Sequence, residues 1–247
     1  DSALLDIPGP AGLFTYPMLI SFFLMIVLMP ITQPQLTMRY FIPKSKKVLR
    51  TMMIATPIFA ILALLPTMFI GLGAKLIDPA LASGDLALNT ILTLFPEIIV
   101  AIAVVAVVAA SMSTADSQVL ALSALVSRDL FKKHQMKIAR ISILFIIVLA
   151  LFIAVKPPTL IVTLSILSFA GTLQVAPAMI GGLFWKKGTA AGAIASMLSG
   201  TGVLILYQWF MKPLYGFHAA FWGFVVGTIV YIVVSLLTKN NKSAKKF

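Results

Sequence analysis

Acidic residues and cysteine are what this sequence has least of. Its 247 residues include seven Asp and Glu, two His and no Cys. The missing cysteines exclude disulfides and thiolate metal sites. His134 and His218 are isolated, whereas a zinc site needs three or four clustered ligands, so we expect no zinc site. Only 11% of the residues are charged, which is too few to cover a soluble domain of this length.

Long apolar runs take the place of the missing charge. Hydrophobic residues make up 60% of the chain, and the mean hydropathy is +1.06. A run of about 20 apolar residues crosses the ~30 Å hydrocarbon core of a bilayer as a helix. The pattern predicts an all-α, multi-pass membrane protein in contact with lipid, forming a single membrane domain over residues 1–247. Its seven spans are expected at 13–33, 50–73, 97–126, 138–155, 159–184, 189–211 and 217–238.

The basic residues alternate between the two ends of these spans. Sixteen of the nineteen Lys and Arg fall in the loops after the first, third and fifth spans and in the tail at 239–247. The positive-inside rule places these segments in the cytoplasm, with the N-terminus outside the cytoplasmic membrane and the C-terminus inside. A net charge of +12 divided into such clusters is typical of topology signals and does not indicate nucleic-acid binding. Because the first residue is Asp1 and not Met, we expect the chain to be part of a longer polypeptide.

The loop at 74–96 differs from the others in being long and partly apolar. Its run from Leu86 to Phe95 favours a short external helix over a plain loop. Pro96 and Glu97 then suit the start of the third span, because proline fits the first helical turn and a negative charge is favoured by the helix dipole.

Hydroxyl groups gather on one face of the third span. Ala110, Ser113, Thr114 and Ser117 stand at i, i+3, i+4 and i+7, which is one side of a helix. Two neighbouring hydroxyls beside a residue too small to cover its own carbonyl suit a hard monovalent cation such as sodium. Serine and threonine also serve as ordinary contacts between membrane helices, so spacing alone leaves both interpretations open.

Asp116 is the only acidic residue deep within an expected span. It lies about 110° around the helix from the Ser113 and Thr114 face, at 100° per residue. A carboxylate at this depth indicates function: it could join Ser117 in a second cation site, relay a proton or pair with a basic group. A structural hydrogen bond is the alternative.

Two other spans carry helix-breaking residues beside a glutamine. Pro30, Gln33 and Pro34 interrupt the end of the first span, and the run from Gly171 through Gln174 to Pro177 interrupts the fifth. Transporters use such broken helices to line a central cavity, which makes Gln33 and Gln174 candidates for lining a substrate cavity. A kink filled by a neighbouring helix is the alternative for each break taken alone.

The motifs in these spans resemble those of the sodium:solute symporter family. The most specific match is Met112-Ser-Thr-Ala-Asp-Ser-Gln118, continuing to Ser127-Arg-Asp-Leu-Phe131. Gln33-Pro-Gln35 with Arg39-Tyr40, and Pro177 with the run from Phe184 to Gly192, resemble flanking motifs in the same order. Together the matches cover residues 16 to about 200.

The resemblance implies a LeuT-like fold of two inverted five-helix repeats, of which this chain is the C-terminal portion. Residues 13–184 would form the second repeat, and 189–238 two additional helices. Sodium would bind the Ser113 and Thr114 hydroxyls and the Ala110 carbonyl, with its remaining ligands in the missing N-terminal half. Asp116 and Ser117 would correspond to a second cation site.

The resemblance also bears on the transported solute. Family members that carry proline have tryptophan and tyrosine shortly before the Gln-Pro pair, where this chain has Ile26 and Pro30. The third-span motif is closer to carriers of organic acids such as pantothenate.

We therefore expect sodium-coupled symport of a small organic solute across the cytoplasmic membrane. The alternatives are a proton-coupled carrier that uses Asp116 and a membrane sensor domain of the same fold. No enzyme activity is expected, because no nucleophile stands beside a base in the pattern.

Overall fold

The computed structural model describes residues 15–81, 83–131, 135–155, 161–210 and 214–238. Within these ranges every regular element is helical. The predicted tail at 239–247, His134 and the loop lysines Lys132, Lys133, Lys156 and Lys212 lie outside the described residues.

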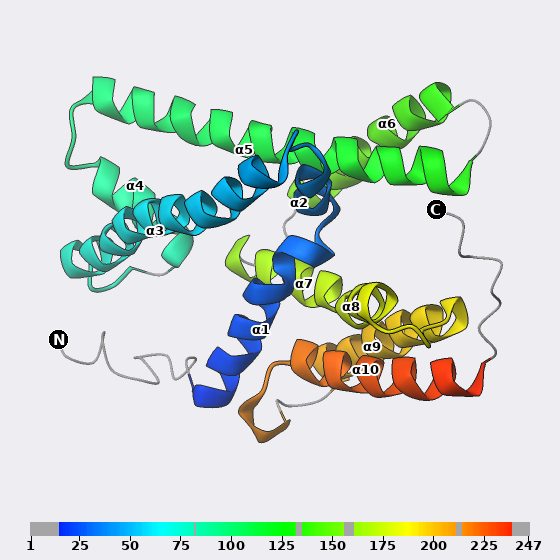
Figure 1. The fold of residues 1–247 in the computed structure, drawn as a ribbon. Coiled ribbons are helices and arrows are strands. Elements are labelled where there is room, and N and C mark those ends of the chain that lie inside the picture. The colour runs from blue at the N-terminus through cyan, green and yellow to red at the C-terminus, as the bar shows by residue number, and fades with distance from the viewer. Residues whose placement is uncertain (1–14, 82, 132–134, 156–160, 211–213, 239–247) are drawn as a thin grey trace. The chain divides into compact units, whose positions relative to one another are not determined.

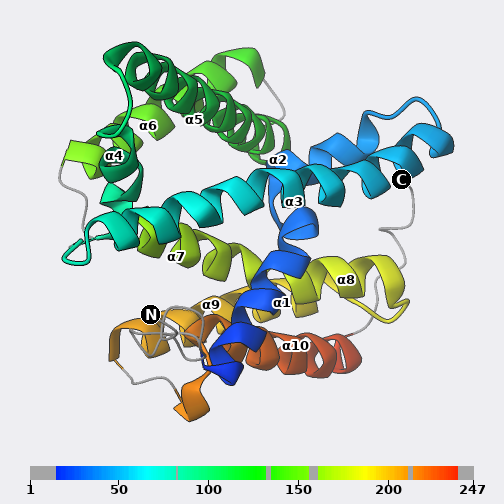
Figure 2. The same ribbon diagram turned by 90° about the vertical axis from the view of Figure 1, so that its left-hand side faces the viewer.

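The α-helices in these ranges follow the predicted spans closely (Figures 1 and 2). Their bounds are α1 (Tyr16–Thr32), α2 (Pro34–Thr37), α3 (Lys46–Ile77), α4 (Ala87–Leu92), α5 (Glu97–Leu125), α6 (Gln135–Val155), α7 (Ile161–Leu173), α8 (Ala176–Phe184), α9 (Ala190–Phe210) and α10 (Ala219–Leu237). Six helical stretches of the described chain are long and apolar enough to cross a membrane, and seven if the bent pair at Tyr16–Phe41 is one span. The all-helical, multi-span prediction is confirmed at this level.

Local signals explain several helix ends. The helix α5 begins at Glu97, as the sequence predicts, and Pro96 is its N-cap residue rather than part of the first turn. It continues into a π-helical turn at Val126–Leu130, so the whole segment is longer than a single crossing requires. The predicted external helix is also present, as a 3₁₀ turn at Gly84–Leu86 followed by α4.

The chain divides into two compact units, Asp1–Thr37 with Thr163–Phe247, and Met38–Val162. The first unit contains the described buried core. There α1, α7, α8, α9 and α10 meet around small and apolar side chains, namely Met25, Ala170, Leu173, Ala176, Leu204, Ala219 and Ala220. A hydrogen bond links two of these helices, because the Ser21 hydroxyl of α1 accepts the backbone N–H of His218, the N-cap residue of α10, at 3.1 Å.

The most extensive helix pair in this unit is α9 with α10, which lie side by side (Figure 1). Gly192, Ser196 and Gly200 are spaced four residues apart on α9, and Gly223 and Gly227 repeat that spacing on α10. A Cβ placed on Gly200 would stand 3.0 Å from the Gly223 carbonyl, and one on Gly223 would stand 2.6 Å from the Gly200 carbonyl. The backbones therefore approach through paired glycines, as membrane helices do when apolar burial gives no drive to associate.

The second unit consists of α3, α4, α5 and α6. Here α3 packs on α4 and α5 packs on α6. The Asp85 carboxylate accepts the backbone N–H of Ile161, a residue of the same unit, at 3.2 Å. The most apolar 18-residue stretches of α3, α5 and α6 are 0% buried, against 22–28% for the long helices of the first unit.

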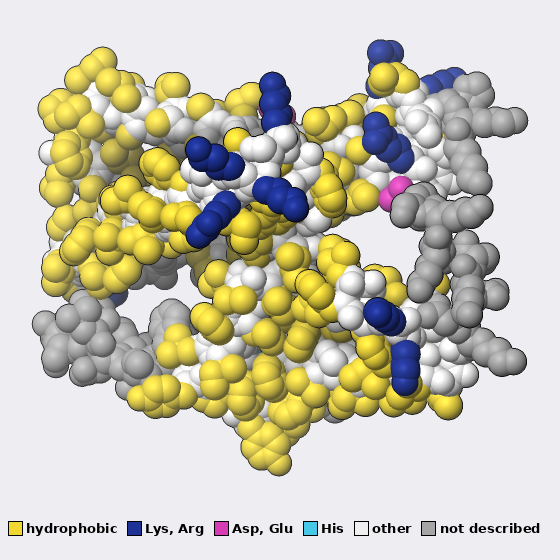
Figure 3. Space-filling view, in the orientation of Figure 1, with side chains coloured by type: hydrophobic (Ala, Val, Ile, Leu, Met, Phe, Trp, Pro, Cys, Tyr) yellow, Lys and Arg dark blue, Asp and Glu magenta, His cyan; other side chains and the backbone are white. Residues whose placement is uncertain are grey.

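The surface view shows the consequence of this low burial. Hydrophobic side chains cover most of the visible face, and Lys and Arg side chains appear in a few groups (Figure 3). Helices that are apolar all round need lipid or other helices as neighbours.

The predicted orientation can be tested by cysteine labelling. Lys75 lies in the last turn of α3, on the side assigned to the outside, and Lys187 follows α8 on the side assigned to the cytoplasm. In a cysteine-free full-length protein, Lys75→Cys is expected to react with an impermeant maleimide on intact cells, and Lys187→Cys only after permeabilisation. Labelling of Lys187→Cys on intact cells would reverse the topology.

Candidate functional site

The predicted cation ligands lie on α5, in the second unit. Ala110, Ser113, Thr114 and Asp116 are exposed and Ser117 is half-buried. The Thr114 Oγ1 donates to the Ala110 carbonyl oxygen at 3.2 Å, so two of the three predicted sodium ligands are neighbours. Two neutral oxygens at this separation can turn to one small cation with little movement of the helix.

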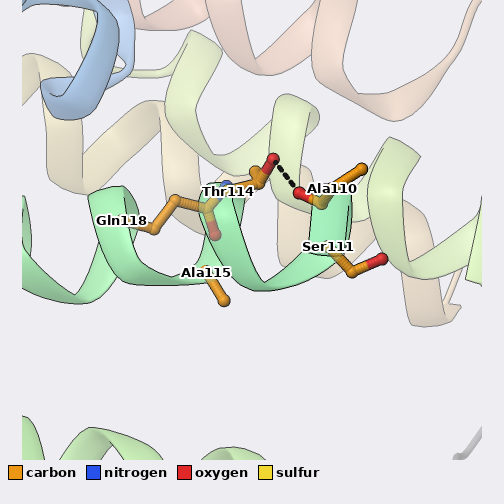
Figure 4. Close-up of a pocket in the computed structure, with 5 residues that line it drawn as sticks. All are labelled: Ala110, Ser111, Thr114, Ala115 and Gln118. Atoms are coloured by element: carbon orange, nitrogen blue, oxygen red, sulfur yellow. Dashed lines mark hydrogen bonds between the residues drawn. The ribbon is translucent and has the colours of Figure 1, made fainter. Parts of the chain in front are cut away.

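A hollow of about 460 Å³ opens over this part of α5 (Figure 4). Its lining residues are Ala110, Ser111, Thr114, Ala115 and Gln118, and all five come from the one helix. Ser113 is not among them. Ser111 and Gln118 were missed by the sequence reasoning, although they flank the predicted face at i+1 and i+8 from Ala110 and could have been found from that spacing.

Two further hydroxyls of this region, those of Ser111 and Ser117, bond back to their own helix. Ser111 Oγ donates to the Val107 carbonyl at 2.8 Å. Ser117 Oγ lies 2.9 Å from the Thr114 carbonyl and 3.2 Å from that of Ser113. Such bonds to the preceding turn satisfy a hydroxyl in an apolar environment, and they leave its lone pairs free to bind a cation.

Carboxylates play little part in the site. No three His, Asp or Glu side chains gather into a group within the described ranges. Asp116 is exposed and lies on a different side of α5 from the hollow, which it does not line. The oxygen set is therefore neutral, which suits a monovalent cation better than a divalent one.

The first helix break forms a corner that satisfies its own backbone. The pair Tyr16–Thr32 and Pro34–Phe41 is bent by 56°. Pro34 has no N–H, so the Pro30 carbonyl loses its helical donor. The Thr37 hydroxyl lies within 3.1–3.3 Å of the carbonyl oxygens of Pro30, Ile31 and Gln33 and supplies the donor that the break requires.

Gln33 is buried at this corner. Its side chain is 7% exposed, and its Oε1 accepts from Gln35 Nε2 at 2.5 Å. The structure thus places Gln33 in a local glutamine pair. Its predicted role in lining a substrate cavity stays a prediction.

Gln174 occupies the second break, between α7 and α8, and is 1% exposed. Its Nε2 donates to the Ala170 carbonyl at 2.9 Å and lies 3.3 Å from that of Ala220. No N–H or O–H of the described residues reaches its Oε1. This oxygen faces Gly200 and Gly223, where added Cβ atoms would stand only 2.7 and 2.8 Å away.

The two glycines therefore form a socket for the Gln174 amide. Their Cα–H groups are the donors available to Oε1, a weak interaction known between closely packed helices. The sequence reasoning did not identify this socket, although the Gly-xxx-Ser-xxx-Gly and Gly-xxx-Gly spacings were a signal for it. As with Gln33, the predicted role of Gln174 in a substrate cavity stays a prediction.

Broken helices and a row of hydroxyls within a multi-pass helical chain are features of secondary transporters. The chain belongs to the sodium:solute symporter family, whose model matches residues 7–200. This match confirms the predicted family, which is one of membrane transporters and not of enzymes.

The curated relatives share this class. A sodium/pantothenate symporter of Haemophilus influenzae is 28% identical over 238 residues, which covers 91% of this chain and 49% of the relative. A sodium/proline symporter of Staphylococcus aureus is 33% identical over 165 residues, covering 59% of this chain and 32% of the relative. The chain thus spans about half the length of the first and a third of the second. No solved structure matches it significantly.

The glycine socket makes a prediction with an internal control. Gly200→Ala brings a methyl group against Gln174 Oε1 and the Gly223 carbonyl, and is expected to cost about 1–3 kcal/mol as overpacking. Gly202→Ala, two residues along the same helix, meets nothing within 4 Å and should be neutral or mildly stabilising. Thermal unfolding of the detergent-solubilised protein measures both. Equal melting temperatures for the two variants would contradict the socket.

Proposed function

We propose that this chain is the C-terminal half of a sodium-coupled symporter that moves a small organic solute across the cytoplasmic membrane by alternating access. In this proposal the Ala110 carbonyl and the Ser113 and Thr114 hydroxyls bind the sodium ion. Residues 13–184 form the second of two inverted repeats of a LeuT-like fold, and α9 and α10 are additional helices.

One observation carries the proposal: the hollow over Ala110 and Thr114 is lined from a single helix. Even with the Ser113 hydroxyl, three neutral oxygens cannot hold a sodium ion alone, because hard cations take about six oxygen ligands. The missing ligands must come from residues outside the lining set. The curated relatives are longer than this chain, which supports placing those ligands in an N-terminal half.

Coupling follows from differential affinity. A cation held between α5 and the other half stabilises whichever arrangement brings its ligands together. Sodium would bind in the outward-open state, favour solute binding there and be released once the site opens inward. The chain's own contribution is to present oxygens on a helix that moves as a rigid element.

The solute is proposed to be a small organic acid. The pantothenate relative aligns along 91% of this chain, whereas the proline relative aligns along 59% of it. Ile26 and Pro30 also replace the aromatic residues of the proline-type pattern.

Asp116 supports a second candidate, a proton-coupled carrier. Among the residues that the structure describes, it is the only acidic side chain in the middle of a long helix. With the half-buried Ser117 one residue further along, it is alternatively a second cation site. Its exchange for asparagine separates these roles.

The sodium site is tested by removing its hydroxyls one at a time. Ser113→Ala and Thr114→Ala are each expected to raise the sodium concentration for half-maximal uptake at least about tenfold, since a polar group facing a charge contributes roughly 1.5–3 kcal/mol. Thr114→Ser should retain most of the affinity. Thr67→Ala, which removes a hydroxyl bonded to its own helix in α3, is the control. Sodium dependence unchanged in both alanine variants would refute the assignment.

Replacing Asp116 by Asn tests the choice of coupling ion. For a sodium-coupled carrier, Asp116→Asn should leave solute uptake driven by a sodium gradient and insensitive to a proton gradient at constant sodium. Uptake in proteoliposomes with each gradient imposed separately makes the measurement. If Asp116→Asn abolished an uptake that needed protons but no sodium, the proton-coupled alternative would replace the proposal.

A further inference from the structure

A second hollow, of about 440 Å³, lies between α8 and α10 in the first unit. Ile180 forms part of one wall, and Phe224 and Ile232 form part of the other. From Phe224 to Ile232 it follows α10 for about 12 Å at 1.5 Å per residue. Its volume falls within the ~300–1,000 Å³ of ligand pockets.

The shape of this groove depends on a glycine and a tyrosine. Tyr231 is 3% exposed, and its ring packs so closely on Gly181 that a Cβ there would collide with it. The same Cβ collision would occur at Gly188 with the Tyr231 hydroxyl. The buried Tyr231 ring thus forms the bottom of the groove between α8 and α10.

The lining is apolar in its chemistry as well as its composition. Among the lining residues, Thr228 carries an aliphatic hydroxyl. This hydroxyl donates to the carbonyl oxygen of Phe224, in the same helix, at 2.7 Å. A ligand in the groove therefore meets hydrocarbon and aromatic surface and needs no hydrogen bond there.

One end of the groove is polar. Trp185 lies against Tyr231 with ring centroids 5.7 Å apart, and paired aromatic side chains of this kind are enriched where a membrane meets water. The backbone N–H of Gly188 donates to the Trp185 carbonyl at 3.0 Å and closes a tight turn. Lys186 and Lys187 are the two central residues of this turn and are exposed.

These two lysines are the only Lys, Arg, Asp or Glu among the described residues of the first unit. Lys186 takes part in an interaction within the chain, so Lys187 is the group to consider. A positive charge at the polar end of an apolar groove matches a molecule with an anionic head and a hydrocarbon tail. A second copy docking through the same unit would bring lysines and no carboxylate from the described residues, so charge complementarity favours the lipid.

We propose that the groove between α8 and α10 binds an anionic phospholipid, with an acyl chain along Ile180, Phe224 and Ile232 and the headgroup at Lys187. On the predicted topology this is a lipid of the cytoplasmic leaflet, where anionic headgroups attract basic residues near the membrane surface. The proposal does not depend on the coupling ion or the solute.

Native mass spectrometry of the purified full-length protein tests it, with dioleoyl phosphatidylglycerol and dioleoyl phosphatidylcholine as probes. Wild-type protein should retain the anionic lipid in preference. Lys187→Gln should reduce its retention about fivefold, the equivalent of the ~1 kcal/mol that one lysine contributes near an anionic surface. The matched control, Lys75→Gln, should change nothing.

Filling the groove tests the acyl chain separately. Thr228→Trp and Ile232→Trp each place an indole in the hollow and should reduce retention of the anionic lipid, whereas Ile58→Trp on the exposed face of α3 should not. Two tryptophan variants are measured so that the test remains decisive if one of them fails to fold.

Three results would overturn the proposal. The first is equal retention of the two lipids by the wild type, or unchanged retention in Lys187→Gln and both groove variants. The second is displacement of the bound lipid by inorganic phosphate, which would show a headgroup contact without the groove. The third is a dimer that dissociates in Thr228→Trp with no change in bound lipid, which would give the groove to a second copy.

Discussion

Hydrocarbon offers no hydrogen-bond partner, so every backbone N–H and C=O within a membrane must be paired inside the protein. Helices pair these groups along their length, so unpaired backbone groups arise mainly where a helix breaks. At the first break the Thr37 hydroxyl supplies the donor that Pro34 lacks. At the second, Gln174 bonds backbone carbonyls of α7 and of α10. Each interruption is therefore stabilised by a polar side chain near it.

The two units differ in how far their helices are buried within this chain. The first has a core in which α9 and α10 approach through glycine and serine, so closely that a Cβ added at Gly223 would stand 2.6 Å from the Gly200 carbonyl. The second has long helices whose most apolar stretches are unburied within this chain. Such helices are stable in lipid. A polar face on one of them needs another protein element beside it, because hydrocarbon offers its hydroxyls no partner. The relatives' greater length is consistent with that covering element.

The candidate cation site shows why hydroxyls and carbonyls suit a transporter. The Thr114 hydroxyl donates to the Ala110 carbonyl oxygen at 3.2 Å, so these neutral groups satisfy each other and bring no charge into the membrane. A carboxylate in the same place would carry a large desolvation cost each time the ion left. Neutral oxygens allow binding and release to stay close in free energy, which repeated transport requires.

The membrane spans could be predicted from the sequence, because hydrophobic length is a local property; the membrane orientation and the cation ligands on α5 stay predictions. The start of α5 at Glu97 and the short external helix could be predicted as well. Only the tertiary structure decided what surrounds Gln33 and Gln174. The socket for Gln174 joins the break between α7 and α8 to glycines of α9 and α10. Glycine has no side chain, so the sequence alone does not indicate this contact. The same holds for the groove beside Tyr231, which exists because Gly181 lets α8 and a buried ring come together.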